Sequence, residues 1–275
     1  MRITLSIMIN TVSACGEPLT QILELLRSYE ISATFFISTG TDHALPWTQR
    51  LAGRGEIRRQ SESLGTIPAA GHDVGLSSHD PQVWSNKVAH ADASWVREQW
   101  HRGVSEWSEL FGEQPQMHAA ANYQLHPELF ACEQDAGMKF ASDTRGQTPY
   151  YPAMTDVESI VLQLPVTVAS PEEMMRVKPN CLAHLHEELF DASLKLLPQG
   201  QHWRIVAGRD DLKLVEKLIV MWRGTSKEFI SLSQIADFYA VDGEVHLHRV
   251  GWQELGTGHY VAAQSLPLDE ESGYE

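Results

Sequence analysis

The sequence has little positive charge. Its 275 residues include 21 lysines and arginines against 36 aspartates and glutamates, a formal net charge of −15, and protonating all 13 histidines would still leave the balance negative. Nucleic-acid binding needs clustered Lys and Arg that displace counterions from phosphates. Anionic membrane surfaces attract the same residue types. The composition therefore argues against nucleic acid and against charged lipid surfaces as partners.

Cysteines and long apolar runs are also scarce. Cys15, Cys132 and Cys181 are far apart and odd in number, so they form neither a disulfide framework nor a CxxC metal clip. No stretch is apolar over the roughly 18 residues that a transmembrane segment requires. The first ten residues lack the basic start, apolar core and cleavage site of a signal peptide. We therefore expect a soluble, cytoplasmic protein with no transmembrane segment.

Strand and helix patterns alternate along the chain. Arg2–Asn10 alternates apolar and mixed positions, a helical pattern follows Pro18, and Ala33–Ser38 is a second strand. A short strand–helix–strand connection implies parallel pairing. Further strands are predicted at Val74–Leu76, Met117–Ala121, Lys139–Ser142, within Ser159–Val168, at Trp203–Ala207 and at Phe229–Leu232, and helices at Ala93–Phe111, Pro127–Ala136, Cys181–Leu197 and Asp211–Trp222.

About seven such strands and no linker favour one α/β domain, a distorted parallel (β/α) barrel over residues 1–239. After the barrel, residues 240–266 are predicted to be a C-terminal hairpin extension, with a hairpin over Ala240–Val250 that turns at Asp242-Gly243. The acidic tail 267–275 is predicted to fray.

Three motifs resemble the polysaccharide deacetylases of the NodB-homology type. The run Ala33-Thr34-Phe35-Phe36 is similar to their second strand, and His72-Asp73-Val74-Gly75 to the segment before their metal histidines. The third motif is Phe140–Gly146, followed by Gln163–Thr167. The resemblance runs from about Arg2 to Tyr239, and it is strongest to the branch that deformylates an aminoarabinose on an undecaprenyl phosphate carrier.

The resemblance implies a NodB-like distorted barrel that hydrolyses an N-acyl sugar. In that family a divalent metal lies on one aspartate and two histidines and activates a water. A second aspartate acts as the base, and a histidine late in the chain acts as the acid.

The positions that match these roles carry other residues here. The Asp-x-Asp of the first strand becomes Met8 and Asn10, and the two metal histidines become Ser77 and Pro81. A thioether is a poor ligand for a hard cation, an amide oxygen is a weak one, and proline offers none. No metal or other cofactor is therefore expected, unless zinc occupies a relocated site.

Two further roles are lost and two charged residues persist. Gln124 stands at the position of the arginine that orients the base, and Val206 at that of the acid histidine. Asp143 and Arg145 persist, either to order the loop at the barrel end or to contact substrate, with Arg145 suited to a phosphate. With Asn10, Ser77 and His79 they form the predicted ligand-binding set.

Three hypotheses follow. The first is a barrel that has lost metal-dependent N-deacylation and binds a sugar, a sugar-lipid or a protein partner at the old cleft. The second is an active N-acyl amino sugar deacetylase or deformylase with altered ligands such as Asn10, His79 and Asp143. The third is a regulatory partner of an active relative. Candidates for a relocated metal site are His72, His79 and His118 near one end of the barrel, and Glu244, His246 and His248 on one face of the hairpin.

Overall fold

The computed structural model describes residues 2–10, 16–40, 61–196, 201–241, 243–256 and 258–267. Strand β1 (Arg2–Asn10) lies at the centre and is buried along most of its length. It pairs in parallel with β2 (Thr34–Ser38) on one side and with β9 (Gln201–Val206) on the other. Burial on both faces is typical of a barrel strand, and it explains why this strand is rich in apolar residues.

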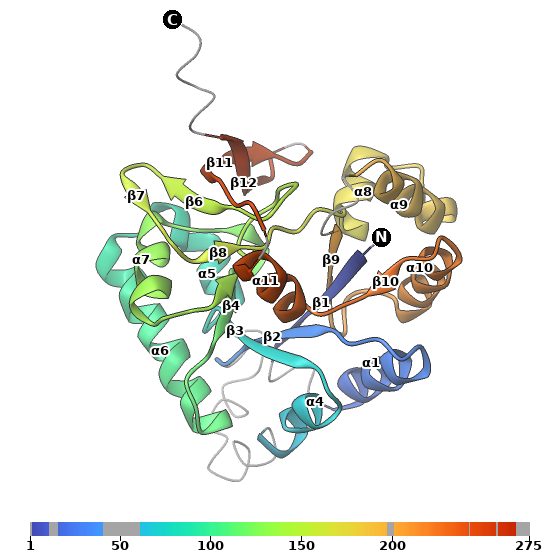
Figure 1. Ribbon diagram of the computed structural model, residues 1–275, viewed down its shortest axis with the longest axis horizontal. Coiled ribbons are helices and arrows are strands. Elements are labelled where there is room, and N and C mark those ends of the chain that lie inside the picture. The colour runs from blue at the N-terminus through green and yellow to red at the C-terminus, as the bar shows by residue number, and fades with distance from the viewer. Residues whose placement is uncertain are drawn as a thin grey trace, which may run out of the picture.

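The parallel strands follow one another in the order β9-β1-β2-β3-β4-β5-β8, and helices surround them (Figure 1). The chain after β8 reaches β9, because the N–H groups of Thr167 and Val168 donate to the carbonyl of His202. The prediction of a distorted (β/α) barrel is confirmed. The remaining strands of this sheet are β3 (Asp73–Ser77), β4 (Met117–Ala119), β5 (Phe140–Ala141), β8 (Leu162–Gln163) and β10 (Glu228–Phe229), which pairs with the start of β1.

The helices cover the barrel with their apolar faces. Helix α1 (Glu17–Ser28) has proline in its first turn and buries an apolar stripe. Helix α6 (Ala93–Phe111) begins at Asp92, whose carboxylate accepts the N–H of Trp95, and ends at Gly112 in the left-handed region. The others are α4 (Thr66–Ala69), α5 (Pro81–Lys87), α7 (Pro127–Asp135), α8 (Pro171–Val177), α9 (Leu185–Leu194), α10 (Leu212–Gly224) and α11 (Leu232–Val241), with 3-10 helices η1 (Val88–His90), η2 (Ala121–Tyr123) and η3 (Leu182–His184).

The C-terminal hairpin is present, but its predicted turn is wrong. Strands β11 (Leu247–Glu254) and β12 (Tyr260–Pro267) pair antiparallel, so the chain reverses over residues 255–259. Helix α11 runs through Val241, so the Asp-Gly pair follows a helix instead of joining two strands. Asp242 and the predicted tail from residue 268 onward lie outside the described residues.

The hairpin belongs to a second sheet that the sequence did not predict. Strand β11 pairs in parallel with β6 (Tyr151–Met154), which pairs antiparallel with β7 (Val157–Glu158). The order of this sheet is β12-β11-β6-β7. The hairpin is thereby tied to a segment that lies inside the predicted barrel region. No helix in the described ranges has the length and apolar character needed to cross a membrane.

Candidate functional site

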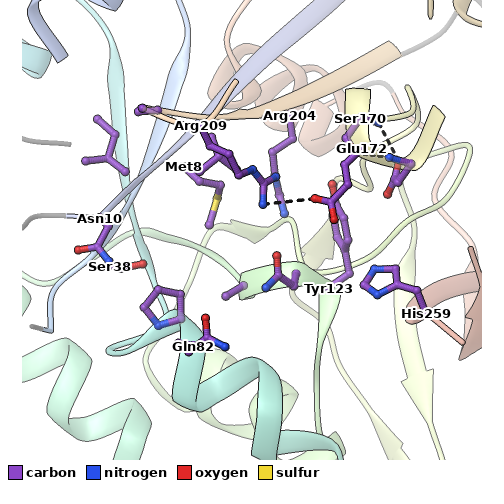
Figure 2. Close-up of a pocket in the computed structure, with 18 of the residues that line it drawn as sticks. Met8, Asn10, Ser38, Gln82, Tyr123, Ser170, Glu172, Arg204, Arg209 and His259 are labelled. Atoms are coloured by element: carbon purple, nitrogen blue, oxygen red, sulfur yellow. Dashed lines mark hydrogen bonds and ion pairs between the residues drawn. The ribbon is translucent and has the colours of Figure 1, made fainter. Parts of the chain in front are cut away.

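A cavity of about 520 Å³ opens where β1, β2 and β9 end (Figure 2). Active sites of (β/α) barrels lie at this end, because the carboxyl ends of parallel strands and the following loops meet there. The N-terminus of α5, the chain around η2, the start of α8 and His259 before β12 complete the wall.

Four of the positions that the motif resemblance matches to catalytic or metal-binding roles share this cavity: Met8, Asn10, Pro81 and Val206 all line it. The register explains two of them, since Met8 lies opposite Val206 in the β1–β9 pair. The side chain of Met8 points into the cavity (Figure 2). The structure thus brings together residues that are up to 198 positions apart along the chain, from Met8 to Val206.

These residues do not fit the divalent metal that the fold family implies. Proline, methionine and valine offer no oxygen or nitrogen ligand from their side chains, and Asn10 offers at best an amide. Ser77 is buried, and its hydroxyl donates to the carbonyl of Ala119 at 2.9 Å. A Lewis-acid site built from carboxylate and imidazole is therefore not formed by these positions.

Two other predicted residues do not line the cavity. His79 Nδ1 lies 2.7 Å from the Glu106 carboxylate on α6. Gln124 donates through Nε2 to the carbonyl of Tyr260, and its own carbonyl accepts the indole N–H of Trp84. Gln124 therefore connects the segment after η2 to the hairpin, and His79 is held against a helix.

The charged residues Asp143 and Arg145 make hydrogen bonds within the protein and do not line the cavity. Asp143 is fully buried and accepts the N–H of Ala120 at 2.7 Å and Nε2 of Gln163 at 2.7 Å. Arg145 donates to the carbonyls of Val166 and Val168, at 2.7 and 3.0 Å. Neither residue is part of the cavity wall, so their contacts agree with the loop-ordering interpretation.

Asp143 also takes part in a buried ionic cluster. Nδ1 of His118 lies 2.8 Å from the Glu133 carboxylate and 2.9 Å from the Asp143 carboxylate. Burial alone lowers the pKa of His118, but the two carboxylates outweigh it and raise that pKa to about 9. Burial, together with the charge of Asp143, raises the pKa of Glu133 to about 8. Burial also opposes ionisation of Asp143, yet His118 holds the pKa of Asp143 below its usual value. The cluster therefore favours an imidazolium paired with an ionised Asp143 and disfavours ionisation of Glu133.

This cluster is also the one group of three metal-ligating side chains within the described ranges, with ligand atoms within 4.8 Å of one another. All three residues are buried, and their mutual hydrogen bonds already use the facing atoms. The alternative set with His72 and His79 is not formed. His72 precedes β3 and accepts the N–H of Ala33, whereas His79 follows β3, so the two histidines lie at opposite ends of that strand.

The charged residues of the cavity were not predicted from the sequence. Arg204 on β9 points into it, and Arg209 contacts Glu172 across its rim (Figure 2). The missed residues of the wall are Tyr123, Glu172, Glu173, Arg176, Arg204, Arg209 and His259.

Comparisons with known proteins agree with this geometry. No family model matches the chain. The chain is 22% identical to a curated protein of Shewanella sediminis, and the similarity covers 88% of each chain. That protein is named a probable 4-deoxy-4-formamido-L-arabinose-phosphoundecaprenol deformylase. A Mycobacterium smegmatis structure named for polysaccharide deacetylase has a TM-score of 0.65 at 16% identity, over 92% of this chain and 95% of that one. A CE4 family pseudoenzyme from Bacillus anthracis has a TM-score of 0.54 at 12% identity, over 90% and 69%.

The fold is therefore that of the NodB-type polysaccharide deacetylases, a group of solved structures that includes pseudoenzymes. Within that group, the curated similarity is to a deformylase of a formamido-arabinose lipid. The resemblance inferred from the three motifs is confirmed.

Proposed function

We propose that this protein is a NodB-type barrel that has lost metal-dependent N-deacylation and binds a sugar or sugar-lipid in the cavity at the strand ends. The observation that carries the proposal is the presence of Met8, Asn10, Pro81 and Val206 in one cavity. A cavity is present at this end of the barrel, and Met8, Pro81 and Val206 bring no acid, base or oxygen or nitrogen ligand to it. The names of its relatives point to carbohydrate ligands.

Hydrolysis of an amide requires three events, and the cavity lacks the groups for them at the matching positions. The carbonyl must be polarised, a water deprotonated and the leaving amine protonated. Met8 cannot accept a proton and Val206 cannot donate one. Pro81 leaves no ligand for the ion that would polarise the carbonyl. One such loss could be compensated elsewhere, but these affect the base, the acid and the metal together.

The second hypothesis, an active deacylase with Asn10, His79 and Asp143 as ligands, gains no support from the geometry. Asn10 lines the cavity, His79 contacts Glu106, and Asp143 is buried with His118. The third hypothesis, a structural or regulatory partner of an active relative, would be recognised by co-purification with that enzyme.

Metal analysis and a substrate panel test the proposal directly. We expect protein purified without chelator to hold no stoichiometric zinc, cobalt or nickel. We also expect no release of acetate or formate from N-acetylated or N-formylated amino sugars when these metals are added. A stoichiometric metal together with chelator-sensitive deacylation would overturn the proposal.

A gain-of-function variant provides the positive control. Asn10→Asp, Ser77→His and Pro81→His together place an aspartate and two histidines at the positions matching the family's metal ligands. We expect the triple variant to retain zinc through dialysis and Asn10→Asp alone to lose it. A mutant of the B. anthracis pseudoenzyme is named as having restored enzymatic activity. Equal zinc retention by the wild type and the triple variant would contradict the proposed loss of the site.

A further inference from the structure

Arg204 places a buried positive charge at the cavity. Arg204 is only 6% exposed, so most of its guanidinium is withdrawn from water. Nη2 donates to the carbonyl and the hydroxyl of Ser142, at 2.5 and 2.7 Å, and Nε lies 3.4 Å from the Ser6 hydroxyl. All of these acceptors are neutral. The contacts satisfy two nitrogens of the fork without neutralising its charge.

No carboxylate forms an ion pair with this charge in the part of the chain that the structure describes, and the charges of Asp143 and Glu173 favour it only from a greater distance. Within the 4.0 Å limit of an ion pair, Arg204 has no acidic partner there. The rings of Tyr123 and Phe36 lie 5.0 and 5.7 Å from its guanidinium carbon and stabilise the cation partly. Burial lowers the pKa of Arg204, yet arginine stays protonated in proteins. A buried charge without a counterion is costly, so this arrangement favours an anion that arrives from outside.

The two carboxylates of the cavity wall are already paired with other groups. Glu172 contacts Arg176 at 2.5 Å and Arg209 at 3.6 Å. Glu173 accepts the N–H of Ser170 and lies 3.4 Å from Arg145. These pairs hold the two carboxylates against other cations, and neither carboxylate makes an ion pair with Arg204.

The described wall of the cavity carries a formal charge of +1, three arginines against two glutamates, although the protein is strongly acidic. The arginines are Arg176, Arg204 and Arg209, and the glutamates are Glu172 and Glu173. The whole chain carries a formal net charge of −15. A concave site concentrates its local field, so a positive cavity attracts anions even in an acidic molecule.

We infer that the cavity binds a ligand with an anionic oxygen group, a carboxylate or a phosphate, which pairs with Arg204. The inference rests on the proposed function, because it takes the same cavity as the binding site. It adds the charge of the ligand and the residue that recognises it. Guanidinium groups suit both oxyanions through charge-assisted hydrogen bonds.

Calorimetric titration with four probes tests the inference: glucose, glucuronate, glucose 6-phosphate and inorganic phosphate. We expect at least one charged sugar to bind about tenfold or more tightly than glucose, a difference of roughly 1.4 kcal/mol. The better of the two charged sugars identifies carboxylate or phosphate. Equal affinity for charged and neutral sugars would overturn the inference but leave sugar binding intact. Inorganic phosphate bound through Arg204 without any sugar would support the anion site and count against sugar binding. If none of the four probes binds, the inference of an anion-binding cavity is overturned.

Two arginine variants separate recognition from folding. Arg204→Gln is expected to abolish the preference for charged sugars, with circular dichroism to check the fold. Should Arg204→Gln fail to fold, Arg209→Glu reverses a charge at the rim, where the side chain is 51% exposed. Its matched control is Arg102→Glu on α6, 50% exposed and paired with Glu98. We expect Arg209→Glu to weaken binding of the charged sugar several-fold and Arg102→Glu to leave it unchanged. Equal effects of the two reversals would contradict a local anion site.

Discussion

The cavity at the strand ends and the buried cluster of His118, Glu133 and Asp143 differ in how accessible their polar residues are. The cavity is reachable from solvent, and its matching catalytic positions include Met8 and Val206. The cluster contains an imidazole and two carboxylates, the groups from which metal and acid–base sites are made, yet all three residues are buried. In the cluster, these residue types therefore lie where no substrate reaches them.

This contrast shows that accessibility, not residue count, locates a site. The sequence contains 13 histidines and 36 acidic residues, which taken alone would favour a metal centre. In the structure, the one close group of this kind within the described ranges is buried, and its imidazole already contacts both carboxylates. The wall of the accessible cavity holds three arginines beside Glu172, Glu173 and His259. We propose two roles for these charged groups, stability in the cluster and ligand recognition in the cavity.

Removing the imidazole of the cluster should give the largest effect on stability. His118→Ala leaves Asp143 and Glu133 buried without their common cation, and loss of one partner of a buried ion pair costs about 3–5 kcal/mol. We expect a loss of this size in the free energy of unfolding, measured with urea. The matched control is His101→Ala, an exposed histidine on α6, which should change stability little. A His118→Ala protein as stable as the control would refute the structural role of the cluster.

The pH dependence of stability should report the same cluster. The folded-state pKa values of His118, about 9, and Glu133, about 8, lie above the unfolded values of 6.5 and 4.5. Folded protein therefore binds more protons than unfolded protein, and stability falls as pH rises through these windows. Asp143, with a lowered pKa, adds stability above 3.8 that is lost in acid.

We expect the free energy of unfolding to fall by a few kcal/mol between pH 6.5 and 9. Glu133→Gln removes one titration and should leave a fall confined to the His118 window. Urea titrations at half-unit pH steps measure both proteins. A flat profile from pH 6.5 to 9 in both would show that the imidazolium does not stabilise the fold.

Local patterns were sufficient for the long elements of the fold. Alternation over Arg2–Asn10 and helical spacing over Ala93–Phe111 gave bounds that match the structure. The strands β6 and β7 were missed because they are short and their partner β11 lies far along the chain. Helix α8 was missed despite a signal, since Ser170 and Glu173 form a capping box around a proline start.

The site could be predicted only in part for a related reason. Met8 and Asn10 were placed by the alternation of one strand, whereas Arg204 looked like a strand residue with no indication of what it faces. Its surroundings come from η2, α8 and β2, which tertiary packing brings together. Glu133 carried a usable signal, since it follows Leu129 and Phe130 at helical spacing and so lies on the buried side of α7.

The smallest predicted effect concerns the helix that forms one cavity wall. Asp80 caps α5 by accepting the N–H groups of Gln82 and Val83, and α5 presents Pro81 and Gln82 to the cavity. Asp211 likewise caps α10 through Lys213, on a helix that does not line the cavity. Each change to alanine should cost about 1 kcal/mol of stability. We expect only Asp80→Ala to weaken charged-sugar binding as well, by a few-fold in the same titration, because the wall loosens where the cap is lost. Equal affinities in the two variants would show that α5 encloses the cavity without shaping recognition.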